Sequence, residues 1–300
     1  MNNTLNNVST NVRHYRVKTV FVTIAILALC RMPAYAADRI AVTKGQTIAF
    51  LGDSITAAGA RSGGYCKLVL DGLKQQGIEA KGVFAGISGH KSNQMLARLE
   101  KDVLSKKPDW MTLSCGVNDV WHGARGVAIE PYKKNITEIV TKAQAAGIKV
   151  MLLTSTMIGE DQTTSNNQKL LPYNAFIRQL AKDKNCLLAD LNTDMQEALK
   201  KFPKGAKGNK LTGDGVHMNA LGNAMMAKGL LKAFGLTDAQ LAGVEKGWRD
   251  MPNTQSIRFQ VGMSMAEAEK LNAIAAKAKK SLSQLFTEFL NEKKAAMLKE

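Results

Sequence analysis

One serine in the sequence, Ser54, stands where a reactive hydroxyl would be exposed. It follows Gly52 and Asp53, directly after residues 47–51, whose apolar character predicts a buried strand. A sharp turn from a strand into a helix exposes a serine hydroxyl at the end of a sheet, and the positive end of that helix favours negative charge. The position therefore fits a nucleophile, although the same triplet also occurs in ordinary turns whose serine caps a helix.

A histidine and a carboxylate lie together near the end of the first 220 residues. Asp214 precedes His217 by three positions, immediately before an apolar segment that predicts a helix from Ala220. At that spacing a carboxylate can meet the imidazole within one turn, hold one tautomer and stabilise the imidazolium ion. The pair therefore predicts a general base and the group that orients it.

Two further loops could donate hydrogen bonds to a developing oxyanion. Asn118 follows a predicted strand over residues 110–114, and Gly89 lies in a glycine-rich loop after a second short strand. An asparagine amide and an unhindered glycine N–H are suitable donors, although either residue could serve only to form a tight turn. Together with Ser54, His217 and Asp214 they make the set of groups that acyl transfer requires.

The elements that must position these groups alternate between strands and helices. Such alternation predicts a parallel sheet with right-handed crossovers in an α/β, three-layer αβα sandwich. Functional loops then lie beyond the carboxyl ends of the strands, and we expect the four loops that carry these five residues at that edge. The predicted strands cover residues 47–51, 83–84, 110–114, 150–153 and 186–191, and the predicted helices cover 64–76, a segment capped by Ser92, 131–147, 172–181 and 220–234.

Four short blocks resemble those of the SGNH (GDSL-type) hydrolases, in the same order and with similar spacing. They are residues 48–56, 86–89, 116–119 and 214–217. The resemblance covers about residues 45–234 and implies a flavodoxin-like fold with a five-stranded parallel sheet. It also implies that Ser54 is the nucleophile, His217 the base and Asp214 its orienter. The oxyanion hole would consist of the N–H groups of Ser54 and Gly89 with the side-chain amide of Asn118.

The resemblance implies a serine esterase that works through an acyl-enzyme without a metal or other cofactor. We expect an acetylated saccharide as substrate, because the chain is predicted to be exported and Trp121 could stack on a sugar ring. His122 and His90 lie on the same loops and lack a partner at metal-ligand spacing, so we assign both to substrate binding. The alternatives are a lysophospholipase or thioesterase of the same fold, and a glycan-binding module without catalysis.

The overall charge and the N-terminus bear on location and partners. The 300 residues carry a formal charge of +16, which raises nucleic acid as a partner. Residues 1–36, however, have the basic start, short apolar run and small-residue cleavage site of a secretory signal peptide. The apolar run is too short to span a membrane, so no stable insertion is expected after cleavage. We therefore predict a periplasmic or extracellular protein that does not bind nucleic acid.

The remaining chain divides into a predicted catalytic domain, residues 37–236, and a C-terminal extension, residues 237–300. The extension combines an alternating stretch over residues 256–261 with an amphipathic helical stripe, and in outline it looks like a ribbon-helix-helix DNA-binding unit. The predicted export argues against DNA, which leaves packing on the catalytic domain or formation of a homodimer.

Cys66, Cys115 and Cys186 are expected to be buried free thiols, with one disulfide and an odd thiol as the alternative.

Overall fold

The structure is a computed structural model in which residues 40–203, 207–249, 251 and 261–299 are described. The predicted signal peptide and most of the alternating stretch at 256–261 lie outside these residues. Within the described part of the chain, no helix is both long enough and apolar enough to cross a membrane. Cys66 and Cys115 are buried free thiols, and Cys186 is a half-buried one.

A single parallel sheet of five strands forms the centre of the fold, as predicted. The strand order is β2-β1-β3-β4-β5, and Gly52 at the end of β1 is level with Gly86 at the end of β2. All the carboxyl ends therefore meet along one edge. The strands are β1 (Thr47–Gly52), β2 (Lys81–Gly86), β3 (Trp110–Ser114), β4 (Lys149–Leu153) and β5 (Leu187–Ala189).

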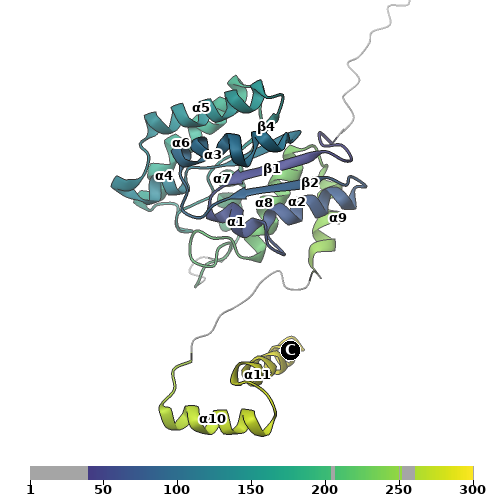
Figure 1. Ribbon diagram of the computed structural model, residues 1–300, viewed down its shortest axis with the longest axis vertical. Helices are drawn as coiled ribbons and strands as arrows, with labels where there is room; N and C mark the ends of the chain where they lie inside the picture. The colour runs from purple at the N-terminus through teal and green to yellow at the C-terminus, as the bar shows by residue number, and fades with distance from the viewer. Residues whose placement is uncertain (1–39, 204–206, 250, 252–260, 300) are drawn as a thin grey trace, which may run out of the picture. The chain divides into compact units, whose positions relative to one another are not determined.

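Helices cover both faces of this sheet and complete the three-layer sandwich (Figure 1). One face carries α3 (Ser92–Asp102), α5 (Ile129–Ala145) and α6 (Ser165–Asp183). The other carries α2 (Tyr65–Gln75), α8 (Ala220–Ala233) and α9 (Asp238–Arg249). Shorter helices lie in the connections that follow β1, β3 and β5: α1 (Ser54–Gly59), α4 (Val117–Trp121) and α7 (Leu191–Leu199).

Helix α5 begins at Ile129, two residues before the predicted start at Pro131. Two other helix starts differ more from the predictions. Helix α6 begins at Ser165 and continues through Pro172, whereas the sequence predicts a helix that starts at the proline. Ser92 is the first residue of α3 and not its cap, since the N-cap position belongs to Lys91. The Ser92 hydroxyl instead donates to the carboxylate of Asp119, 2.6 Å away. At Ser92 the tertiary contact with Asp119 outweighs the preference of serine for the N-cap, and at Pro172 the longer helix outweighs the preference of proline for the first turn.

Helix α9 follows the boundary predicted after residue 236, yet it is part of the same hydrophobic core. Its Leu241, Val244 and Trp248 are buried. The Trp248 indole N–H donates to Asp71 of α2 at 2.9 Å, so the contact between the two helices also has a polar component.

Two more helices lie in the C-terminal extension, α10 (Met265–Lys277) and α11 (Leu282–Met297). Each begins with a capping box, formed by Ser264 with Glu267 and by Ser281 with Gln284. These reciprocal bonds satisfy N–H groups that have no partner inside the helix. Ala275 is the one buried residue of α10, and α11 has none among the residues that the structure describes.

Candidate active site

Ser54 is the first residue of α1 and lies directly beyond β1. Asp53 caps this helix by accepting a hydrogen bond from the Ile55 N–H at 2.9 Å. A side chain could not replace the hydrogen of Gly52, because a Cβ there would lie 2.0 Å from the Thr56 hydroxyl oxygen. The turn is therefore tight, and it leaves the Ser54 side chain half-buried at the edge of the sheet.

The structure brings Ser54, His217 and Asp214 into one hydrogen-bonded chain. The Nε2 atom of His217 lies 2.8 Å from Ser54 Oγ, across 163 positions of sequence. Its Nδ1 atom lies 2.7 Å from Asp214 Oδ2. With the Nδ1 proton directed to the carboxylate, Nε2 is left to accept the serine proton. The arrangement can therefore activate a hydroxyl as a nucleophile.

Asp214 is held in its orientation by its own loop. Its Oδ1 atom accepts from the backbone N–H groups of Val216 at 2.9 Å and His217 at 2.7 Å. Partial desolvation raises the pKa of Asp214, but these bonds and the one from the imidazole outweigh it and bring the pKa below the ordinary value. The side chain is therefore charged at neutral pH, as stabilisation of an imidazolium ion requires.

The predicted oxyanion donors lie on the two neighbouring loops. Gly89 has a φ of 77°, a backbone conformation that glycine adopts without strain. Asn118 belongs to α4, and its side-chain NH2 donates to Asp53 Oδ2 and to the His90 carbonyl, both at 3.2 Å. Both amide hydrogens are thus engaged at the long end of the hydrogen-bond range. An oxyanion would have to take the place of one of these partners.

Two buried carboxylates, those of Asp53 and Asp119, hydrogen-bond to the loops that carry Ser54 and the predicted oxyanion donors. Burial raises the pKa of Asp53 to about 6, against the hydrogen bond from Ile55 and the charge of His217. Burial also raises the pKa of Asp119, although hydrogen bonds from Ser92 lower it in part. Asp119 joins the start of α3 to α4, the helix that carries Asn118. The two carboxylates therefore connect three of the four predicted loops.

The residues assigned to substrate binding have different environments. Trp121 is 44% exposed, and its ring is nearly parallel to that of His122, with centroids 6.3 Å apart. His90 is half-buried, and its Nδ1 atom has no hydrogen-bond partner among the described residues. Desolvation and the nearby Arg98 lower the pKa of His90, so its ring is neutral at pH 7. Trp121 is thus the exposed ring of a parallel pair with the half-buried His122, whereas the unpaired ring nitrogen of His90 is buried.

Sequence reasoning missed two charged residues that support the site. Arg98 of α3 is buried and donates at 2.8 Å to the carbonyls of Gly52 and Ala85, at the ends of β1 and β2. Its place among Met95 and Leu99 on the apolar face of a predicted helix was the available signal. Glu160 lies beyond β4 and contacts the loop that carries Asp214, and no pattern in the sequence indicates this contact.

No metal centre is evident among the described residues, where no three His, Cys, Asp or Glu side chains cluster at ligand distance.

Comparison with known proteins adds an independent line of evidence. Residues 50–225 match the model of the GDSL-like Lipase/Acylhydrolase family. An acetylxylan esterase of Geobacillus stearothermophilus is 27% identical over 215 residues, which cover 65% of this chain and 96% of the relative. The esterase TesA of Pseudomonas aeruginosa is 37% identical over 110 residues, 36% of this chain and 53% of its own length.

Solved structures give the same result. The crystal structure of the acetyl xylan esterase AlAXEase is similar with a TM-score of 0.58 and 40% identity, and the match covers 62% of this chain and 98% of that one. The acetylxylan esterase Axe2 of Geobacillus stearothermophilus matches with a TM-score of 0.59 and 25% identity, over 65% and 97% of the two chains. In both cases the similarity covers nearly all of the other protein.

Proposed function

Because the chain belongs to the GDSL-like lipase/acylhydrolase (SGNH) family and is a carboxylic ester hydrolase, we propose that it removes acetyl groups from a xylan-type polysaccharide outside the cytoplasm. The observation that carries this proposal is the hydrogen-bonded chain from Ser54 through His217 to Asp214. Similarity to acetylxylan esterases over nearly their whole length supports the choice of acyl group and alcohol. The predicted signal peptide supports the location.

In the first half of the reaction, Ser54 Oγ attacks the acetyl carbonyl carbon while His217 Nε2 takes the hydroxyl proton. Asp214 stabilises the imidazolium ion that results. The carbonyl oxygen becomes an oxyanion, which accepts hydrogen bonds from the N–H groups of Ser54 and Gly89 and from the Asn118 amide. When the tetrahedral intermediate collapses, the sugar oxygen leaves and takes the proton from His217. Ser54 then carries the acetyl group.

In the second half, water attacks the acetyl-enzyme as His217 takes one of its protons. The same oxyanion donors stabilise the second tetrahedral intermediate. Its collapse returns the proton to Ser54 Oγ and releases acetic acid. In both halves His217 carries each proton that moves, while the oxyanion donors only donate hydrogen bonds, so the proposed reaction needs no further acid or base.

The rim of the site supports a saccharide as the alcohol part of the substrate. Trp121 is the exposed last residue of α4, one turn from Asn118, and its ring is stacked nearly parallel to that of His122. A flat aromatic face of this kind packs against the C–H groups of a pyranose. We propose that these two rings hold a xylose unit while the acetyl group enters between Gly89 and Ser54.

The Ser54→Ala variant tests the serine mechanism. We expect kcat/KM for p-nitrophenyl acetate to fall by at least about 10³-fold with an unchanged melting temperature, because the nucleophile is lost and the core is untouched. The matched control is Ser105→Ala, an exposed serine away from this edge, which should retain wild-type activity. Undiminished turnover by Ser54→Ala would exclude the mechanism.

The same preparation distinguishes the substrate classes. We expect acetate release from acetylated xylan, and a steep decline in kcat/KM from p-nitrophenyl acetate to the decanoate. A preference for the decanoate or for a lysophospholipid would favour the alternative acyl hydrolase. Binding of xylan without release of acetate would indicate the non-catalytic module.

A further inference from the structure

One carboxylate, that of Glu160, binds several consecutive residues of the segment just before Asp214 and His217. Glu160 lies after β4, about 50 positions before this segment. Its Oε2 atom accepts from the Lys210 N–H at 2.6 Å, and its Oε1 atom accepts from the N–H groups of Leu211 at 2.7 Å and Thr212 at 2.8 Å. Oε1 also accepts from the Thr212 hydroxyl at 2.8 Å. Four donors from three consecutive residues thus converge on one side chain.

Further hydrogen bonds link Thr212 and Gly159 to Gly215, the residue after Asp214. The Thr212 hydroxyl oxygen accepts from the Gly215 N–H at 3.0 Å, and the Gly215 carbonyl accepts from the Gly159 N–H at 2.7 Å. Both polar groups of Gly215 are therefore bonded to Thr212 or to the neighbour of Glu160. Gly215 has a φ of 95°, so these bonds also maintain a backbone conformation that other residues rarely adopt.

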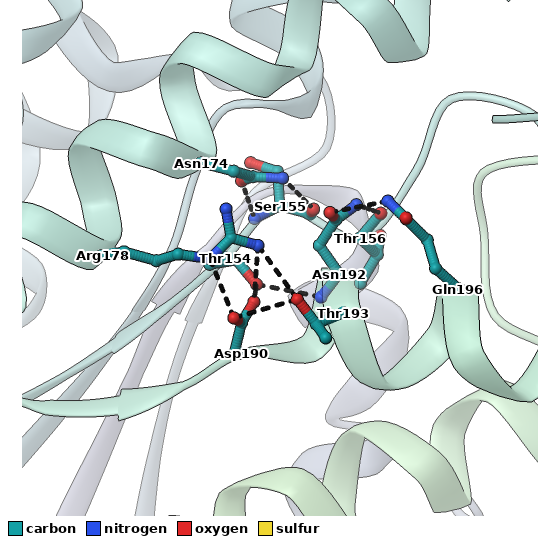
Figure 2. Close-up of polar contacts among 9 residues, drawn as sticks. All are labelled: Thr154, Ser155, Thr156, Asn174, Arg178, Asp190, Asn192, Thr193 and Gln196. Atoms are coloured by element: carbon teal, nitrogen blue, oxygen red, sulfur yellow. Dashed lines mark hydrogen bonds and ion pairs between the residues drawn. The ribbon is translucent and has the colours of Figure 1, made fainter. Parts of the chain in front are cut away.

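The segment that bears Glu160 is itself firmly held. Ser155 exchanges two hydrogen bonds with Asn174 of α6, and the Thr156 carbonyl accepts from Asn192 of α7 at 2.6 Å (Figure 2). Closer to Glu160, Asn167 accepts from the Ile158 N–H at 2.8 Å and donates to the Gly159 carbonyl at 2.9 Å. Glu160 therefore extends from a segment that α6 and α7 fix beside the sheet.

We propose that Glu160 is a positioning residue for the esterase reaction, one that sets the distance between His217 and Ser54 through Thr212 and Gly215. The inference rests on the proposed function, because it assigns a role within that reaction. A carboxylate suits this place because both of its oxygens accept hydrogen bonds. A glutamine amide of the same shape has one accepting oxygen, and its NH2 would face an N–H group of residues 210–212.

If Glu160 positions His217, its replacement should lower kcat more than it raises KM. A His217 ring displaced by a fraction of an ångström still leaves the substrate surface intact, but it accepts the Ser54 proton poorly. We therefore expect Glu160→Gln in the full chain to lower kcat for p-nitrophenyl acetate by about 10- to 100-fold. KM should change by less than about threefold. The matched control is Glu197→Gln, an exposed glutamate of α7 that should leave both constants unchanged.

A second pair of variants tests the link through Thr212, which is 2% exposed. Thr212→Val keeps the shape but loses the hydroxyl, and its kcat should fall by a similar factor. Thr212→Ser restores the hydroxyl and should recover most of that loss. This pair also decides the question if Glu160→Gln does not fold.

The inference is wrong if Glu160→Gln folds and keeps kcat within twofold of wild type, or if Thr212→Ser is as impaired as Thr212→Val. A larger effect on KM than on kcat would also overturn it, because Glu160 would then shape the binding surface. Ser54→Ala, measured alongside, distinguishes this failure from failure of the proposed function. If only the inference fails, Ser54→Ala is inactive while Glu160→Gln is active. If the proposed function fails, Ser54→Ala is itself active.

Discussion

Asp53, the residue before Ser54, combines two roles that oppose each other. Its carboxylate caps α1 and accepts a hydrogen bond from Asn118, so the charged form orders two elements of the site. The same carboxylate is 2% exposed, and burial disfavours its charge. A pKa of about 6 in the fold, against 3.8 for the free side chain, means that this burial destabilises the protein at neutral pH.

The cost of this charge can be measured with Asp53→Asn. Because the pKa is raised in the fold, the folded state binds more protons than the unfolded state between about pH 4 and 6, and stability falls as the pH rises through that interval. The amide cannot ionise and escapes this loss. The stability of Asp53→Asn relative to wild type, measured as the difference in the free energy of unfolding, should therefore be roughly 2 kcal/mol higher at pH 7.5 than at pH 4. Urea denaturation at both values measures it.

The control for this prediction is Asp183→Asn, at an exposed carboxylate near the end of α6. Measured at the same two pH values, it shows how much of any change comes from removing one negative charge and how much comes from the buried position of Asp53. If the relative stability of Asp53→Asn did not change with pH, the carboxylate at position 53 would not be titrating in this range.

At the scale of elements, the contact between β2 and α1 sets where Ser54 stands. Gly86 ends β2 directly beside the backbone of α1, and a Cβ on it would lie 2.3 Å from the Ala57 nitrogen. The atoms that this Cβ would meet belong to the backbone of α1, which cannot rotate away as a side chain can. Gly86 therefore permits α1, and the serine at its start, to lie close to the sheet.

Gly86→Ala should push α1 away from β2. We expect a loss of about 1–3 kcal/mol in the free energy of unfolding, from overpacking. A fall in kcat of about 10²-fold should accompany it, because Ser54 moves relative to His217. Thermal denaturation and p-nitrophenyl acetate kinetics measure the two effects.

Gly243→Ala is the matched control, since this helical glycine of α9 has open space where its Cβ would be. It should stabilise the fold by about 0.5–1 kcal/mol without affecting kcat. Equal behaviour of the two alanine variants would mean that the contact at Gly86 does not constrain α1.

At the scale of the whole molecule, the sequence after residue 236 contains two kinds of helix. Helix α9 contributes three buried side chains to the core and an ion pair between Glu245 and Lys228 of α8 at 2.9 Å. Helices α10 and α11 have strong caps but leave Ile274 and Phe289 each 52% exposed. Within the described residues, the core and the proposed site are therefore complete by Met251.

A chain that ends at Met251 should keep the wild-type kcat/KM for p-nitrophenyl acetate and a melting temperature within a few degrees of wild type. A chain that ends at Leu236 should be several kcal/mol less stable, because burial of Leu241, Val244 and Trp248 contributes about 1.5–3 kcal/mol for each side chain. Thermal denaturation of both chains measures the difference. The prediction fails if the two truncations are equally stable.

Gel filtration of the full chain and of the chain that ends at Met251 tests the homodimer predicted for the extension. A dimer of the full chain that becomes a monomer on truncation would support it, and a monomer in both would exclude it.

The sheet, the order of its elements and the residues at its carboxyl edge are all predictable from the sequence. Runs such as residues 47–51 and 110–114 predict buried strands because their apolar character is local, and parallel pairing then brings their ends to one edge. Ser54, Asn118, Asp214 and His217 were therefore predictable as neighbours, and the structure places Ser54 next to His217 and His217 next to Asp214.

The contacts that support that edge are visible only in the three-dimensional structure. Glu160 meets residues 210–212 and Asn118 engages Asp53, and neither contact has a signature in the neighbouring sequence. The physical reason is that periodicity reports which face of an element is buried, whereas a hydrogen bond between loops depends on the path of both. The distance from His217 to Ser54 likewise cannot be predicted from local sequence, because it depends on contacts among residues that are far apart in the chain.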